Sequence, residues 1–148
     1  MTRRKPSALL TAALLLLIPS ATLAQHTPAP GSPERKAIAD ALRAPVEKEL
    51  KKKVVFKIDA LKVQDGWAFL RGVPQQPGGK KMDYSGTKYA REIADDMFDD
   101  WICALLRKEG GRWRVVTHVI GATDVVYATW PEDYNAPRAI FDMPEPEQ

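Results

Sequence analysis

The sequence predicts an α+β domain in which one N-terminal helix packs on a four-stranded antiparallel sheet, followed by an irregular C-terminal tail. One observation is an apolar stripe with a spacing of four residues, which is typical of a helix with one buried face. The other two are pairs of β-rich runs, joined by tight turns at Asp65-Gly66 and Gly110-Gly111. A helix followed by two hairpins buries its apolar residues most simply as a helix on a sheet.

The first 24 residues have the pattern of an export signal. Residues 1–6 are basic, residues 7–18 are apolar, and "PSATLA" ends in small residues that suit a signal peptidase. The apolar run is shorter than the roughly 20 residues that span a bilayer. We therefore expect cleavage after Ala24, a periplasmic or secreted location, and a soluble mature chain with no transmembrane segment.

The charge of the mature chain excludes one class of partner. The full chain has 22 Lys and Arg residues against 19 Asp and Glu. Arg3, Arg4 and Lys5 leave with the signal, so the mature chain has 19 of each and is formally neutral. It therefore lacks the general basic field of a nucleic-acid-binding protein, and we expect no nucleic-acid partner.

The 124 residues after the signal suit a single domain. Residues 25–33 are rich in proline and predict a flexible leader. The domain itself is expected over residues 34–143, and residues 144–148 are expected to be a disordered C-terminus.

The helix begins where Ser32 can cap it and Pro33 can occupy its first position. Pro45 lies within this segment and predicts a bend there or a break near Ala44. The cations of "KELKKK" oppose the partial negative charge of the helix C-terminus. The predicted stripe consists of Ile38, Leu42, Val46 and Leu50.

The first hairpin is predicted from residues 54–63 and 67–73, because Asp-Gly between two β-rich runs favours a two-residue turn. Residues 74–86 are predicted to form a loop. Residues 87–98 favour a short helix, with an extended segment as the alternative, because apolar residues recur every four positions.

The second hairpin, centred on Gly110-Gly111, has a register that can be read from its turn. Ile102, Ala104 and Leu106 are expected on the face against the helix, with Leu106 opposite Val115. The other face then pairs Leu105 with Val116, Cys103 with His118, Trp101 with Ile120, and Arg107 with Arg114. This face is too apolar to be bare. The tail, a second copy of the protein or a ligand would cover it, and we expect the tail.

Cys103, His118 and Asp124 are the candidates for catalysis, and Tyr127 is an alternative partner of His118. Cys103 and His118 would form a nucleophile–base pair if they face each other across the strands. The alternative, which we favour, is that Cys103 is a small buried side chain of the core. His118 with Asp124 or Tyr127 is the alternative arrangement for a weak enzyme.

The candidates for binding are Trp101 and His118, with Arg107 and Arg114 at the far end of the hairpin, where directly opposed arginines would be solvated or bind an anion. Two histidines and one cysteine are too few for a zinc site built on those ligands, and the acidic run at 95–100 is interpreted as solvated surface. We expect no metal and no cofactor.

The blocks "GWAFLRG", "ALLRKEGGRWRVV" and "GATDVVYATW" resemble segments of small exported bacterial proteins of unassigned activity, over residues 34–141. The order of one helix and four strands also resembles the cystatin-like and NTF2-like folds. That resemblance implies an α+β architecture, and it implies no particular activity, because such folds include inhibitors, ligand-binding proteins and enzymes.

Together these observations favour an exported, non-catalytic binding module that engages a protein or a cell-envelope component through a sheet face or edge. Association with a second copy through the face of Trp101 and His118 is a further hypothesis. The alternative function is an NTF2-like protein that binds a small ligand, or a weak enzyme with a pocket around His118.

Overall fold

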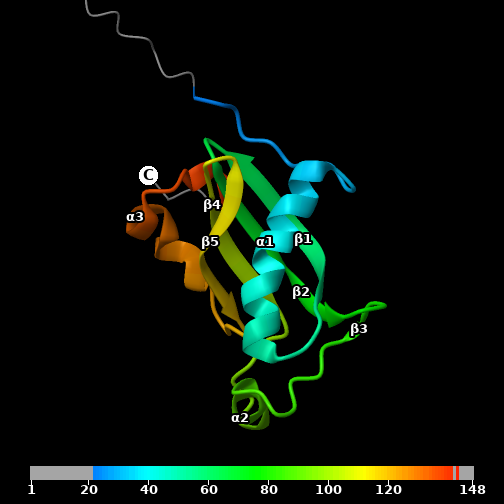
Figure 1. Ribbon diagram of the computed structural model, residues 1–148. Coiled ribbons are helices and arrows are strands. Elements are labelled where there is room, and N and C mark those ends of the chain that lie inside the picture. Colours follow the sequence, from blue (N-terminus) through cyan, green and yellow to red (C-terminus); the bar gives the residue numbers. More distant parts are fainter. Residues whose placement is uncertain (1–21, 142, 144–148) are drawn as a thin grey trace, which may run out of the picture.

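The computed structural model describes residues 22–141 and 143, and it confirms the α+β class. One long helix lies across one face of an antiparallel sheet (Figure 1). The sheet order is β1-β2-β4-β5, and the short strand β3 pairs with the end of β2. The elements are α1 Pro33–Leu50, β1 Val55–Gln64, β2 Trp67–Gln76, β3 Lys80–Lys81, α2 Tyr89–Ala94, β4 Ile102–Glu109, β5 Arg112–Ile120, the 3-10 turn η1 Val126–Thr129, α3 Trp130–Tyr134 and the 3-10 turn η2 Arg138–Ile140.

Helix α1 begins as the sequence predicts, because the Ser32 hydroxyl accepts a hydrogen bond from the Arg35 backbone at 3.2 Å. The prediction of a break near Ala44 is wrong, since the helix continues through Pro45 to Leu50. A proline inside a helix costs about 3 kcal/mol. Burial of the apolar stripe on both sides of Pro45 offsets this cost. All four stripe residues are buried: Ile38, Leu42, Val46 and Leu50.

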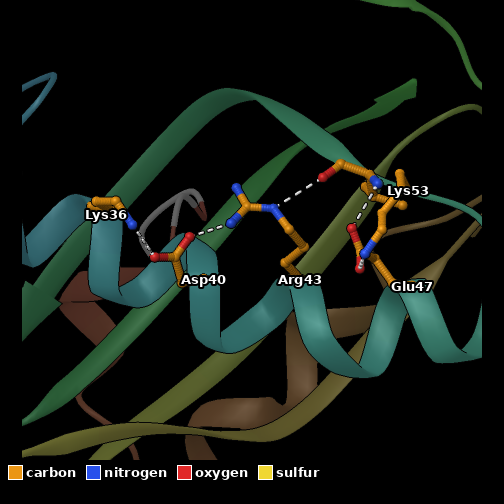
Figure 2. Close-up of polar contacts among 6 residues, drawn as sticks. Lys36, Asp40, Arg43, Glu47 and Lys53 are labelled. Carbon is orange, nitrogen blue, oxygen red and sulfur yellow. Dashed lines mark hydrogen bonds and ion pairs between the residues drawn. The ribbon is translucent and has the colours of Figure 1, made fainter. Parts of the chain in front are cut away.

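Side chains of α1 hold the connection to β1 (Figure 2). Arg43 Nε donates to the Val54 carbonyl at 2.9 Å, and Glu47 Oε1 accepts from the Val54 backbone N–H at 3.1 Å. Asp40 accepts from Arg43 and Lys36, and Lys53 lies 3.1 Å from Glu47. Both backbone groups of Val54 are therefore satisfied before the strand begins.

The two predicted hairpins are confirmed, and so are their turns. Asp65 and Gly66 both have positive φ, as do Gly110 and Gly111. This is the backbone shape that a two-residue hairpin turn requires. The β2 strand runs three residues further than predicted, to Gln76.

Each hairpin edge strand contains a β-bulge that the sequence analysis did not foresee. In β1 the register shifts between Ile58 and Ala60, so Asp59 is the extra residue. In β5 it shifts opposite the Leu105–Leu106 step, and Val116 is the extra residue. A bulge turns the following side chains to the opposite face of the sheet.

The core between α1 and the sheet is closed at one end by the segment that follows β3. Tyr84 and Tyr89 are buried there, and both rings contact Phe98 with centroids 4.8 and 5.6 Å away. Lys52 anchors the segment by donating to the carbonyls of Asp83 and Ser85. The predicted helix at 87–98 exists but is shorter, because it ends at Ala94.

The tail covers the second face of the sheet, as the sequence analysis expected. It consists of short helical turns, and α3 is its longest element with five residues. Figure 1 shows α3 and α1 on different sides of the sheet. The buried residues of this second core are Trp67, Phe69, Cys103, Leu105, Tyr127, Trp130, Ala136, Ile140 and Phe141.

The leader contacts the free edge of β1. His26 and Val63 exchange two backbone hydrogen bonds of 2.9 and 2.8 Å, and His26 Nε2 lies 2.8 Å from Glu34. Within the described part of the chain, no helix is long and apolar enough to cross a membrane. The expectations for residues 1–21 and 144–148 lie outside the described residues.

Candidate functional site

The predicted pair of Cys103 and His118 is wrong, because the two side chains lie on opposite faces of the sheet. Cys103 pairs with Val119, and His118 pairs with Ala104. The extra residue Val116 shifts the register by one beyond Leu106. Cys103 therefore belongs to the core under the tail, whereas Ala104 belongs to the core under α1. The pairings of Leu105 with Val116 and of Trp101 with Ile120 fail for the same reason.

Cys103 is a core residue, as the favoured interpretation held. Its side chain is fully buried. Burial raises the pKa of the thiol from 9.0 to about 12, although a hydrogen bond with the Val119 backbone and the charge of Arg71 act in the opposite direction. Since the thiolate is the nucleophilic form, this thiol is poorly suited to catalysis.

His118 instead contacts Glu49, from the last turn of α1. Its Nε2 lies 2.7 Å from Glu49 Oε2, and the ionised carboxylate accepts this hydrogen bond. Lys88 Nζ lies 2.8 Å from Glu49 Oε1, and the Tyr89 hydroxyl donates to the same oxygen. These side chains border a cavity of about 580 Å³, here called the His118 hollow, which is also lined by Glu92, Val119, Ile120, Gly121 and Ala122.

The electrostatics of Glu49 favour a fixed charge over proton transfer. Burial raises the pKa of this carboxyl, but the hydrogen bonds from its three neighbours outweigh burial and lower the pKa from 4.5 to about 2. A group that stays ionised at neutral pH is a weak general base. Among the described lining residues of the His118 hollow there is no serine, threonine or cysteine to act as its nucleophile. Glu49 therefore joins three elements of the fold.

The other predicted partners of His118 line a different cavity. Asp124 and Tyr127 border a hollow of about 380 Å³ beside Trp101, here called the Trp101 hollow. The two cavities share only Ala122 among their lining residues. The weak-enzyme arrangement of His118 with Asp124 or Tyr127 is therefore not formed. The lining residues of the Trp101 hollow are Asp59, Arg71, Asp99, Trp101, Ala122, Thr123, Asp124, Val125 and Tyr127.

Trp101 is the fixed centre of this hollow. Its backbone N–H donates to the Asp99 carbonyl at 2.8 Å, and its own carbonyl accepts from Gly121 at 3.0 Å. Its indole Nε1 donates to the Ala122 carbonyl. The loop before β4 and the loop after β5 are thus joined around one half-buried ring. A Cβ at Gly121 would lie 2.2 Å from the Phe98 ring, so only glycine fits this junction.

The sheet supplies the floor of the Trp101 hollow. Arg71 lies on β2 and donates from Nη1 to the Tyr127 hydroxyl at 3.4 Å. The Tyr127 ring packs edge-on to Trp101, with centroids 6.2 Å apart. The bulge in β1 places Asp59 at the rim of the same hollow. The hollow therefore combines two aromatic rings and a guanidinium group with three carboxylates.

Asp59 and Arg71 were not among the site residues predicted from the sequence. Arg71 lies in the run "WAFLRGV", and its place beneath the tail depends on the pairing of Arg71 with Cys103 across β2 and β4. The only local signal for Asp59 is a charge that interrupts a β-rich run. No turn residue marks the bulge that directs it toward the hollow.

The structure does not bring Arg107 and Arg114 together with Trp101 and His118. They face each other as predicted, near the turn of the second hairpin. Each has its own partner: the Arg107 guanidinium lies 4.6 Å from the centre of the Trp67 ring, and Arg114 lies 3.3 Å from Glu109. These partners reduce the mutual repulsion of the two arginines.

Two carboxylates of the acidic run at 95–100 have partners within the fold. Asp95 lies 3.6 Å from Arg91, and Asp100 accepts a hydrogen bond from Tyr84 at 2.8 Å. Within residues 22–141 and 143, no three His, Cys, Asp or Glu side chains converge to hold a metal ion.

The comparisons with known proteins add no relative. No family model, curated protein or solved structure matches the chain.

Proposed function

We propose that the protein is an exported binding module that acts without catalysis, and that its ligand binds in the Trp101 hollow. The observation that carries this proposal is a rigidly held tryptophan beside carboxylates that have no partner among the described residues. Among the described residues, the side chains of Asp59, Asp99 and Asp124 have no hydrogen bond or ion pair. In the His118 hollow, by contrast, Glu49 and His118 form a hydrogen bond with each other.

The surfaces left open by the fold support this location. One sheet face is covered by α1 and the other by the tail. The hypothesis of a second copy bound through one face of Trp101 and His118 loses its basis, because these side chains lie in different hollows. The Trp101 hollow falls in the range of about 300–1,000 Å³ that is usual for small-ligand pockets.

The order of one helix and four strands supports the resemblance to cystatin-like and NTF2-like folds, and the first 24 residues support export to the periplasm or the medium. Expression of the full chain in a bacterium, followed by mass spectrometry of the exported protein, tests the second point. A product that begins at Gln25 is expected. A product that keeps Met1 and stays in the cytoplasm would contradict export.

Binding is tested on the mature chain, residues 25–148, with three small probes of matched shape: benzylammonium, benzoate and benzyl alcohol. We expect at least one of them to cause saturable NMR shifts at the Trp101 indole N–H and at the amides of residues 122–125. Trp101→Ala should remove the shifts of the amides of residues 122–125, and Tyr134→Ala, on α3 and outside the lining, is the control. If none of the probes shifts these signals, the proposal is wrong.

A further inference from the structure

We propose that the ligand of the Trp101 hollow carries an ammonium group on a small apolar or aromatic body. This inference depends on the proposed function, since it assigns a chemical class to the ligand of the same site. The charge of the rim, the aromatic wall and the size of the cavity all favour such a ligand.

The charge of the lining favours a cation. Asp59, Asp99 and Asp124 are exposed at the rim and have no partner among the described side chains. Arg71 is the only described cation of the lining and lies on the floor beside the Tyr127 hydroxyl. Three carboxylates at the rim of one cavity give it a negative field that attracts a cation. An anionic ligand would have to pass the same three charges to reach Arg71.

The aromatic wall favours an organic cation over a metal ion. The rings of Trp101 and Tyr127 border the cavity, and the negative face of an aromatic ring attracts an ammonium group. A metal ion held by side chains would need several converging ligands, and no three His, Cys, Asp or Glu side chains converge among residues 22–141 and 143. An aromatic ring with carboxylates at its edge instead matches a cation that has an apolar body.

The size and the construction of the hollow favour a small ligand. A volume of about 380 Å³ lies near the lower end of the range for small-molecule pockets. The wall is preorganised, because four hydrogen bonds hold Asp99, Trp101, Gly121 and Ala122 to one another. A preformed pocket loses little entropy when it binds, so even a small ammonium compound gains measurable affinity.

The test compares the three probes on the mature chain by NMR titration at low salt. Benzylammonium should bind at the Trp101 indole and at residues 122–125 at least several-fold more tightly than benzyl alcohol, and benzoate should bind least. The affinity of benzylammonium should fall in about 1 M salt, where the Debye length is about 3 Å, while that of the alcohol should not.

Substitutions of the rim carboxylates test whether these groups cause the preference for benzylammonium. Asp59→Asn and Asp124→Asn should each weaken benzylammonium a few-fold and leave benzyl alcohol unchanged. Both positions are exposed, so the variants are expected to fold. Asp133→Asn, on α3 and outside the lining, is the matched control.

The outcomes separate this inference from the proposed function. If benzyl alcohol or benzoate binds at the same signals as tightly as benzylammonium, the ligand is not a cation and the proposed binding site stands. If no probe shifts these signals, both proposals are overturned. If benzylammonium binds elsewhere, or if Asp133→Asn weakens it as much as Asp124→Asn, its affinity reflects general surface charge and the inference is wrong.

Discussion

His118 Nε2 lies 2.7 Å from Glu49 Oε2, so the edge strand β5 is joined to the last turn of α1 by residues that are 69 positions apart. Lys88 and Tyr89 bind the other oxygen of Glu49 and add the start of α2 to the same junction. One carboxylate therefore holds three segments of the chain.

Replacement of Glu49 by glutamine should destabilise the protein by about 1–3 kcal/mol at pH 7, because three donors lose an ionised acceptor. The pH dependence has a defined sign. The folded-state pKa of about 2 lies below the ordinary value of 4.5, so this stabilisation is present above about pH 4.5. It is lost as the pH falls through about 2.

Urea denaturation at a series of pH values measures this effect. Glu49→Gln should lose the part of the acid dependence that wild type shows between pH 4.5 and 2. Glu92→Gln is the matched control, since Glu92 lines the same hollow and is exposed. Equal acid dependence in wild type and Glu49→Gln would show that Glu49 does not hold the junction.

The Cys103 thiol should be inert in the native protein and reactive in denaturant. It is fully buried, and a pKa of about 12 in place of 9.0 reduces its thiolate fraction about a thousandfold. Labelling with a chromogenic disulfide reagent at pH 8, with and without denaturant, measures this. A cysteine placed at the exposed position Thr123, in a Cys103→Ala chain, should react at once. Rapid native labelling of Cys103 itself would mean that the tail does not cover the second face.

Gly72→Ala should destabilise the protein by about 1–3 kcal/mol and disturb the Trp101 hollow. A Cβ at this position would lie 2.3 Å from the Lys57 carbonyl oxygen, which lies in β1 just before its bulge. The neighbour that must move is backbone, and its displacement shifts Asp59. Thermal unfolding and benzylammonium titration of the variant check both effects. Wild-type stability would show that β1 adapts without strain.

Phe69→Ala should cost about 3–5 kcal/mol, because Phe69 is fully buried and its ring contacts those of Tyr127, Trp130 and Phe141. Limited proteolysis should then cut the tail first, since the tail packs on this side chain. Val116→Ala, at the exposed bulge of β5, should cost less than about 0.5 kcal/mol. A tail that stays resistant to protease in Phe69→Ala would show that other contacts hold it.

Local patterns predicted most of the fold. The spacing of Ile38 and Leu42 gave the buried face of α1, and the turn residues Asp65-Gly66 gave the first hairpin, because each depends on neighbours a few positions away. The large side chains of the tail predicted its place over the second face. The effect of Pro45 was misjudged, since tertiary packing of the helix outweighs the local cost.

The candidate site was harder to predict, because it depends on two bulges and on distant contacts. One extra residue at Val116 was enough to move His118 to the other face and to dissolve its pairing with Cys103. The extra residue Asp59 brought a carboxylate into a hollow that the tail completes. In the sequence, Glu49 is indistinguishable from an ordinary surface charge, because its partner at position 118 is far away in the chain. Trp101 and Asp124 were predicted as candidates, but the other residues that line their hollow were not.

The tail also determines when the chain can finish folding. Ile120 is the last buried residue of the core between α1 and the sheet. The second core, around Phe69 and Leu105, cannot form until the tail residues Tyr127, Ile140 and Phe141 are also present. A polypeptide that emerges N-terminus first therefore leaves one face of its sheet uncovered until residues 127–141 have emerged. During that interval the exposed apolar face of the sheet is a binding site for a chaperone. Stop codons placed shortly before position 141 would give a truncated chain that keeps this face exposed.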